Sequence, residues 1–442
     1  MFKTFINAFK IKDIRKKLLY TLLMMVIIRI GSQIPIPGVD ATQIKALMEQ
    51  LLGGGDGGII MAITGGSLER MSILALGITP YITSSIVMQL LTIAIPPLEE
   101  MQRDGEDGRK KIAAITRYLT VALALIESGA MAIGYKSLLG DNYNALGIIC
   151  VIAAMTAGSA FLMWIGERIT ENGVGNGISI VLVINIISTF PQDAANLYEK
   201  FVKGKSIPSM ILNSVLIIVV VLGLAVLVIL LNDAIRKIPI QYAKRIQGNK
   251  MLGGNSTSIP VRVNTAGVIP VIFAASLLQF PIIISNMVGF KGGTEGWGLI
   301  WSEALKYMNA QQWFKTSDMK YTLGVIIYVA LIIFFAYFYT SITFNPVEIA
   351  NNLKKAGGFV PGIRPGKPTS EYLNNALNYI IFIGACGLTL VAVIPYIFNG
   401  LFGASVSFGG TSIIIVVSVV IETAQQVESQ MLVRNYKGFL ND

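Results

Sequence analysis

The sequence predicts an all-α integral membrane protein of ten transmembrane helices. Hydrophobic residues make up 53% of the 442 residues and charged residues only 14%, whereas soluble domains carry about 25% charged residues. Apolar runs long enough to cross about 30 Å of hydrocarbon, which takes about 20 helical residues, recur from end to end. A transmembrane barrel would instead require segments of about ten residues with alternating polarity, and the sequence contains none.

Ten apolar runs define the predicted spans. They are 18–34, 71–95, 112–133, 146–165, 178–190, 210–231, 266–288, 321–342, 377–398 and 411–424. The run 178–190 is shorter than most of the others and is expected to end at Pro191. The first span follows a basic stretch but has no small-residue cleavage site, so we expect it to be a retained anchor and not a cleaved signal.

The distribution of Lys and Arg predicts the orientation. With the N-terminus inside, most of the 35 basic residues fall in inner segments, so both termini are expected in the cytosol. The net charge of +10 is then explained by topology. The predicted parts are a cytosolic segment 1–17, an N-terminal half 18–191, a C-terminal half 210–424 with cytosolic loops 232–263 and 344–375, and a cytosolic tail 425–442.

Ten spans divide into two sets of five that point in opposite directions, as in the inverted repeats of transport proteins. Two short matches fall in the register that such a repeat requires. Gly77-Ile-Thr-Pro80 in the second span resembles Gly267-Val-Ile-Pro270 in the seventh, and Gly177-Ile-Ser-Ile180 in the fifth resembles Gly410-Thr-Ser-Ile413 in the tenth. Gly and Pro loosen a membrane helix where a neighbour or a cavity can satisfy its backbone.

Small polar residues follow this weak point in both helices. They are Thr83, Ser84, Ser85 and Gln89 in the second span, and Ser276 and Gln279 in the seventh. Two interpretations fit the Ser and Thr residues: a polar seam with a function, or ordinary helix packing through small side chains. The two glutamines cost more free energy in lipid, so we expect them to face each other or water.

Two predicted cytosolic loops are long and basic. Loop 232–263 carries Arg236, Lys237, Lys244 and Arg245, with an alternation that predicts an extended, twisted hairpin, and loop 344–375 carries Arg364. Such segments suit docking to an acidic protein groove or to RNA phosphates. The alternative is that the charges only fix topology, which explains their sign but not the length of the loops.

Enzyme and metal chemistry have little support. The chain has no histidine, its two cysteines form no CxxC motif, and the Gly-Lys sequences lack the first glycine of a phosphate-binding loop. No cofactor, metal or catalytic residue is therefore predicted. The candidate functions are a passive polypeptide channel, a secondary transporter for a small solute and a membrane-embedded enzyme. The second would need a polar midplane site and the third a catalytic cluster, so the channel is favoured.

Several long motifs resemble the SecY family of protein-conducting channels. They are Arg29-Ile-Gly-Ser-Gln-Ile-Pro-Ile-Pro-Gly38, Met71-Ser-Ile-Leu-Ala-Leu-Gly-Ile-Thr-Pro-Tyr-Ile82, Gly173-Val-Gly-Asn-Gly-Ile-Ser-Ile180, Asn264-Thr-Ala-Gly-Val-Ile-Pro270, Gly357-Gly-Phe-Val-Pro-Gly-Ile-Arg-Pro-Gly366 and Gly409-Gly-Thr-Ser412. They occur in the family's order over essentially the whole chain. The resemblance implies two inverted five-helix halves that close like a clamshell around an hourglass pore.

The resemblance also implies roles for residues. An apolar pore ring would consist of Ile78, Ile82, Leu182, Ile186, Ile272 and Ile415, with Leu182 in place of the commoner isoleucine. A plug is expected at about 56–70 and includes Gly65, Gly66, Ser67, Leu68, Glu69 and Arg70. A lateral gate between the second and seventh spans would carry Thr83, Ser84, Gln89, Ser276 and Gln279. Through it, apolar segments of about 20 residues would leave sideways into lipid while polar ones cross.

The resemblance further implies partners and a location. The basic loops with Arg236, Lys237, Lys244, Arg245 and Arg364 would dock the SecA motor and the ribosome. A SecE subunit would clamp the two halves, SecG would lie beside them, and signal sequences would be the cargo. The chain would be a multi-pass protein of the bacterial plasma membrane that passes unfolded secretory polypeptides and has no enzymatic activity of its own.

Overall fold

The computed structural model describes residues 8–39, 64–134, 144–203, 207–242, 245–247, 250–252, 256–288, 297–314, 319–402 and 410–438. Within these ranges, seven helices are long and apolar enough to cross a membrane, or eight if the bent pair Thr79–Ala94 and Pro96–Gln102 forms one span. Each predicted span overlaps a helix. Two of the ten predicted spans lie outside this count of eight. They are α2, which begins with basic residues, and α11, whose apolar part is short. The predicted all-α membrane fold is confirmed.

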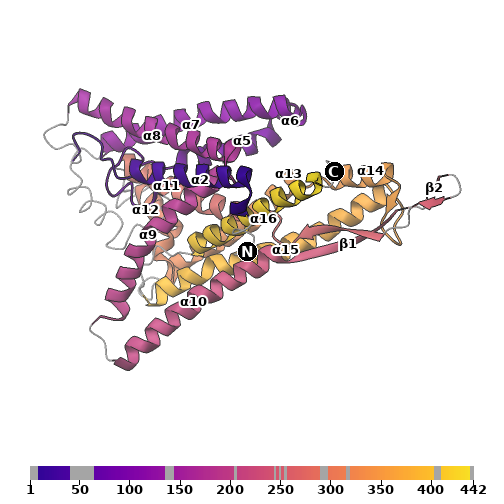
Figure 1. Ribbon diagram of the computed structural model, residues 1–442. Coiled ribbons are helices and arrows are strands. Elements are labelled where there is room, and N and C mark those ends of the chain that lie inside the picture. The colour runs from indigo at the N-terminus through magenta and orange to yellow at the C-terminus, as the bar shows by residue number, and fades with distance from the viewer. Residues whose placement is uncertain are drawn as a thin grey trace.

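The first group of helices holds the N-terminal part of the chain and lies in the upper part of Figure 1, apart from α9, which runs down toward α10. Its members are α2 (Lys12–Gly31), α5 (Thr79–Ala94), α6 (Pro96–Arg103), α7 (Glu106–Gly134), α8 (Ala145–Asn172) and α9 (Gly177–Phe201). Helix α7 packs against α5 and α8, and α8 packs against α9 and α2. A bend of 106° separates α5 from α6.

The second group holds the rest of the chain. Its helices are α10 (Ile207–Asp233), α11 (Ile269–Val288), α12 (Trp297–Met308), α13 (Leu323–Thr343), α14 (Pro346–Lys355), α15 (Lys367–Phe402) and α16 (Gly410–Gly438). The short 3-10 helices η3 (Ala310–Gln312) and η4 (Met319–Thr322) connect α12 to α13. Helix α13 packs against α11 and α15, and α16 packs against α10 and α15. The two groups meet where α9 contacts α16 and α7 contacts α11.

Helix α5 begins later than the sequence predicted. Residues 71–78 form turns, and the helix starts at Thr79 with Pro80 at its second position. Met71 and Gly77 adopt left-handed backbone conformations, with φ of 41° and 60°, and a left-handed residue interrupts a right-handed helix. The run is apolar because it is buried in protein, where Leu74, Ala75 and Leu76 lie in the core.

The fifth predicted span is longer than expected. Pro191 lies inside α9, which continues to Phe201 and does not end at the proline. A proline inside a helix removes one backbone hydrogen bond and can leave the helix kinked but unbroken. Helix α16 likewise runs to Gly438, well past the apolar run that predicted it. Apolar composition therefore located the membrane-spanning part of each helix but not its polar extension.

The two internal matches recur as local structure. Gly77 and Gly267 both adopt left-handed φ, 60° and 63° respectively. Helices α5 and α11 each begin two residues after that glycine, and a proline follows at the second helical position. In the other pair, α9 and α16 begin at Gly177 and Gly410 themselves. The corresponding helices of the two groups therefore start in the same register.

A small sheet projects from the second group, to the right in Figure 1. Strand β1 (Ile235–Tyr242) pairs antiparallel with β4 (Ser256–Arg262) and β5 (Gly358–Phe359), in the order β4-β1-β5. The pair β2 (Arg245–Gln247) and β3 (Lys250–Leu252) forms a separate two-stranded sheet. The predicted hairpin in loop 232–263 is confirmed. Its buried Ile238 and Val261 pack with Leu373 of α15 in one apolar cluster.

The segment between α11 and α13 is held by a polar cluster. Lys306 and Lys320 donate hydrogen bonds to the Glu303 carboxylate at 3.3 and 3.4 Å, and the Tyr321 hydroxyl donates to it at 3.3 Å. Burial opposes the charged carboxylate, but the Lys306 hydrogen bond and the charge of Lys320 hold the pKa of Glu303 below its usual value. Trp313 lies nearby in the core and donates to the Tyr307 carbonyl at 2.9 Å.

Candidate functional site

The six residues expected to form the pore ring gather in one apolar cluster. They come from four helices of both groups: Ile78 and Ile82 from the start of α5, Leu182 and Ile186 from α9, Ile272 from α11 and Ile415 from α16. Five are buried, and Ile272 is partly buried and packs against the others. Residues four apart on a helix share a face, which explains how α5 and α9 each contribute two. The cluster is an apolar contact between the two groups.

The described part of the expected plug contacts α9, the helix that carries Leu182 and Ile186. Gly65 packs against α9, where an added Cβ would lie 2.9 Å from Asn185 Cα and 2.9 Å from Ser188 Oγ. Ser188 Oγ lies 3.4 Å from the Gly65 carbonyl oxygen, while its hydroxyl donates to the Asn185 carbonyl at 2.6 Å. Ser188 is half a turn beyond Ile186 on α9, so the segment touches the same helix as the ring. Residues 56–63 of the expected plug lie outside the described residues.

Backbone hydrogen bonds fix the end of this segment. The Ile36 amide donates to the Met71 carbonyl at 2.9 Å, and the Ile73 amide donates to the Ile34 carbonyl at 3.0 Å. The Arg70 guanidinium also hydrogen-bonds the Gln33 side chain. Gly66, Ser67, Leu68 and Glu69 lie between Gly65 and these ties. The segment is thus held at both ends, by α9 at Gly65 and by the chain after α2 at Arg70 and Met71.

The residues expected at the lateral gate have different surroundings. Ser84 is buried against α7, where its hydroxyl lies 2.6 Å from Thr120 Oγ1 and donates to the Thr116 carbonyl at 3.2 Å. Thr83 donates to the Thr79 carbonyl within α5 at 3.1 Å. The Gln89 amide donates to Ser85 at 3.4 Å. Ser84 therefore faces α7 and not α11, on which Ser276 and Gln279 are both half-buried.

Sequence reasoning did not identify α7 as part of this region. Helix α7 packs against both α5 and α11, so it lies alongside both helices of the expected gate. Thr116 and Thr120 are spaced four apart and present oxygens to Ser84 from one face of α7. Their spacing was visible in the sequence, but nothing local indicated which helix they face.

A second missed feature ties α11 to its neighbours. The buried Asn264, just before α11, donates its amide to the Asn232 side chain at 2.7 Å. The Asn232 amide in turn donates to Ser418 Oγ on α16 at 2.7 Å. Buried amides require such partners, so this chain of bonds fixes the start of α11 against α10 and α16.

The two basic loops meet in the sheet. Gln241 and Tyr242 of β1 pair with Phe359 and Gly358 of β5, which joins loop 232–263 to loop 344–375. Gly358 suits this position, because an added Cβ would lie 3.0 Å from the Tyr242 ring, a tight contact. The exposed residues predicted for docking are Arg236, Lys237 and Arg364. Arg245 belongs to β2, and Lys244 lies outside the described residues.

Among the described residues, no group of three or more His, Cys, Asp or Glu is placed to hold a metal ion. Cys150 and Cys386 are both exposed, on α8 and α15. The described residues of this region comprise an apolar contact between two helix groups, a short segment held against α9 and the chain after α2, and an exposed basic sheet.

The chain is similar to known proteins over most of its length. The protein-family model SecY matches residues 72–424. The chain is 44% identical to "Protein translocase subunit SecY" of Streptomyces coelicolor, with 100% of both chains covered. It is 41% identical to the protein of the same name from Bacillus licheniformis, again with 100% of both covered.

Solved structures share the fold. "The structure of a protein conducting channel" has a TM-score of 0.65 and 19% identity, and the match covers 94% of this chain and 92% of that one. "Sec61 in the Canine ribosome-channel complex from the endoplasmic reticulum" has a TM-score of 0.60 and 18% identity, with the same coverage. From the family match and the full-length relatives together, this chain belongs to the SecY family of protein translocase subunits.

Proposed function

We propose that this SecY-family protein, a protein-conducting channel subunit, passes unfolded secretory polypeptides through a pore between its two helix groups. The observation that carries the proposal is the apolar cluster to which α5, α9, α11 and α16 all contribute. Apolar side chains form a constriction that ions cross poorly. Their contacts are non-directional, so they can separate and close again around an extended chain. Ile78, Ile82, Leu182, Ile186, Ile272 and Ile415 would form this ring.

The segment 56–70 would act as the plug of the resting channel. Gly65 through Arg70 lie against α9 and the residues after α2. The contact at Gly65 leaves no room for a side chain, and its nearest polar approach is a 3.4 Å separation between the Gly65 carbonyl oxygen and Ser188 Oγ. Such a contact is specific in shape but weak, which suits a segment that must leave the pore and return.

The lateral gate would open between α5 and α11, with α7 beside both. Thr83, Ser84, Gln89, Ser276 and Gln279 would determine how readily it parts. An apolar cargo segment of about 20 residues at the open gate would partition into hydrocarbon, and a polar one would continue across. The N-terminal half would span 18–191 and the C-terminal half 210–424.

The basic sheet would bind the partner that supplies the driving force. Arg236, Lys237, Lys244, Arg245 and Arg364 would bind acidic groups of a SecA motor or phosphates of the ribosome. A structure described as "Cryo-EM structure of idle yeast Ssh1 complex bound to the yeast 80S ribosome" shares this fold, with a TM-score of 0.61. SecE and SecG would complete the complex. The chain itself would be passive, in a bacterial plasma membrane, with both termini cytosolic.

The test is ion conductance of the purified complex in planar bilayers. Wild type should be silent, whereas deletion of residues 56–70 should give channels that flicker open. Ile82→Ser should also raise conductance by wetting the ring, while the matched control Ile93→Ser should not. Ile93 lies on the same helix but is exposed, whereas Ile82 is buried. Silence in every variant, together with gradient-driven uptake of a small solute, would refute the channel and favour a transporter.

A further inference from the structure

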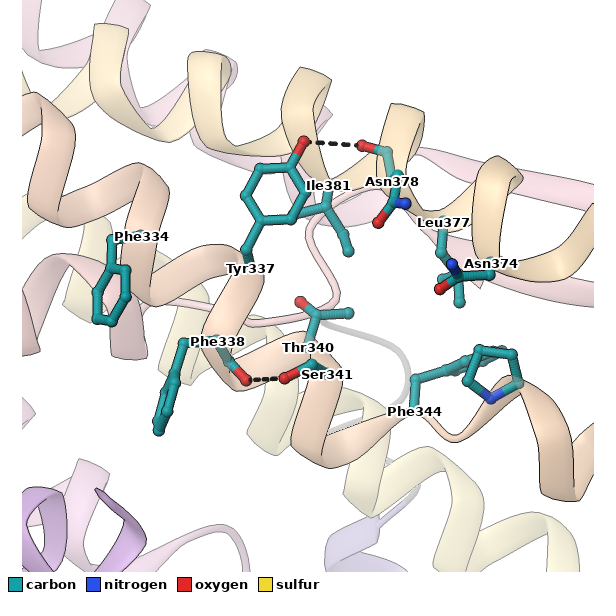
Figure 2. Close-up of a pocket in the computed structure, with 11 residues that line it drawn as sticks. Phe334, Tyr337, Phe338, Thr340, Ser341, Phe344, Asn374, Leu377, Asn378 and Ile381 are labelled. Atoms are coloured by element: carbon teal, nitrogen blue, oxygen red, sulfur yellow. Dashed lines mark hydrogen bonds between the residues drawn. The ribbon is translucent and has the colours of Figure 1, made fainter. Parts of the chain in front are cut away.

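A groove outside the ring and the basic sheet lies between α13 and α15 (Figure 2). It encloses about 630 Å³, within the range of roughly 300–1,000 Å³ for small-molecule sites. The residues that matter for its chemistry are Phe334, Tyr337, Phe338 and Ser341 from α13, and Asn374 and Asn378 from α15.

One side of the groove is apolar and open to the outside of the helix bundle. Phe334 and Phe338 stack on α13, with ring centroids 5.8 Å apart and planes 21° apart. The Phe334 side chain is 54% exposed. Helices α13 and α15 both belong to the segments long and apolar enough to span a membrane. In a bilayer, these aromatic rings would therefore contact hydrocarbon.

The other side offers hydrogen-bond donors. The hydroxyls of α13 are occupied, because Tyr337 donates to the Asn378 backbone carbonyl at 3.1 Å and Ser341 donates to the Phe338 carbonyl at 2.7 Å. The side-chain amides of Asn374 and Asn378 are exposed and make no hydrogen bond to any residue that the structure describes. Figure 2 shows them one turn apart on α15, across the groove from Phe338.

The groove lies where both helices change character. Helix α13 ends at Thr343 and the polar α14 follows, while α15 begins with the polar residues that precede its apolar run. This is the depth of the membrane interface, where hydrocarbon meets ester and phosphate groups. A ligand for the groove must therefore be apolar at one end and carry hydrogen-bond acceptors at the other.

We propose that this groove holds one membrane phospholipid. Its acyl chain would lie on Phe334 and Phe338, and its ester or phosphate oxygens would accept hydrogen bonds from Asn374 and Asn378. A transmembrane helix of a partner would fit less well, because its backbone groups are already paired and cannot satisfy the two amides. No charged residue lines the groove, so anionic and zwitterionic phospholipids should bind with similar affinity.

The proposal is tested with a phospholipid that carries a diazirine in its acyl chain. The purified complex is reconstituted with this probe, irradiated and mapped by peptide mass spectrometry. Peptides covering 334–344 and 374–381 should be labelled more strongly than the lipid-exposed face of α10. Probes with a glycerol and a choline headgroup should give the same pattern.

Two matched variants sharpen the result. Ser341→Trp places a large ring in the groove and should lower labelling there to the level of α10. Ile326→Trp adds the same ring to an exposed position of α13 outside the groove and should leave labelling unchanged. Replacing both asparagines by leucine keeps the groove apolar but removes its donors, and should lower labelling roughly fivefold or more, as expected for the loss of two hydrogen bonds.

Three outcomes would overturn the proposal. Labelling no stronger than at α10, or unchanged by Ser341→Trp, would mean that the groove meets bulk lipid only. Equal labelling after both asparagines are replaced would remove the role of the amides. Absence of lipid labelling in the complex, together with a protein crosslink at Ser341→Cys, would mean that a partner covers the groove. Melting temperatures of all variants show whether each is folded.

Discussion

Gly158→Ala should loosen the segment that we propose as the plug. Gly158 lies on α8, and an added Cβ would be 1.9 Å from the Ile73 carbonyl oxygen. A comfortable carbon–oxygen contact is about 3.3 Å, so Ile73 or α8 must shift by about 1.4 Å. Ile73 and Met71 carry the two backbone hydrogen bonds, 3.0 and 2.9 Å long, that anchor this segment to Ile34 and Ile36. A shift of that size breaks them.

The magnitude follows from those two bonds. Each contributes about 0.5–1.5 kcal/mol net, so the anchored state loses roughly 1–3 kcal/mol. If the anchor holds the plug, the open population rises by roughly 5- to 150-fold. Single-channel recording of the purified complex in planar bilayers measures this directly, and the melting temperature of the same sample should fall.

Gly129→Ala is the matched control. Gly129 lies on α7, which packs against α8, and the nearest atom to its added Cβ is Ile152 Cδ1 at 4.0 Å, an ordinary contact. This variant should remain silent and keep its melting temperature. The reasoning is refuted if Gly158→Ala is as silent and as stable as Gly129→Ala, because the anchor would then be irrelevant to sealing or able to shift without loss.

Three further predictions concern other regions. Asn264→Ala leaves the side-chain oxygen of Asn232 without the hydrogen bond that it accepts from Asn264. It should lower the unfolding free energy of the complex by roughly 1–3 kcal/mol, measured by denaturation against the exposed control Asn351→Ala. Because the pKa of Glu303 is lower in the folded protein than its usual value of 4.5, its ionised carboxylate stabilises the segment between α11 and α13 at pH values above 4.5. This stabilisation is lost as pH falls through the lower folded-state pKa. Tryptophan fluorescence should report the loss, and Glu303→Gln should abolish the pH dependence. Arg236→Glu should slow association with the motor or ribosome at low salt, and the difference should shrink in stopped-flow measurements as salt rises.

The positions of the helices could be predicted from sequence because membrane insertion depends on local composition. About 20 apolar residues are a sufficient signal wherever they occur, and a helix lies at every predicted span. The predicted start of α5 was wrong because it, too, was based on local composition alone. Residues 71–78 are as apolar as a span, but Met71 and Ile73 hydrogen-bond to the chain after α2, and composition carries no information about that pairing.

The sequence could not predict which neighbour each helix face contacts, nor which strands pair. Ser84 was identified as a polar residue of a membrane helix, but its partners Thr116 and Thr120 lie more than 30 residues away on α7. Strand β5 has only two residues, too few for any periodic signal. Its pairing with β1 places Gly358 close to Tyr242, and this joins two loops that are far apart in the sequence.

The corresponding helices α5 and α11 of the inverted repeat have the same local backbone structure at their starts but are held by different hydrogen bonds. Helices α5 and α11 begin in the same register after a left-handed glycine. The start of α5 is tied by backbone hydrogen bonds to residues after α2, whereas the start of α11 is tied through Asn264 and Asn232 to Ser418. Each of these ties lies within one helix group. If the proposed pore lies at the apolar cluster, the groups can separate there without breaking either tie, and the non-directional contacts would adapt to the passing chain.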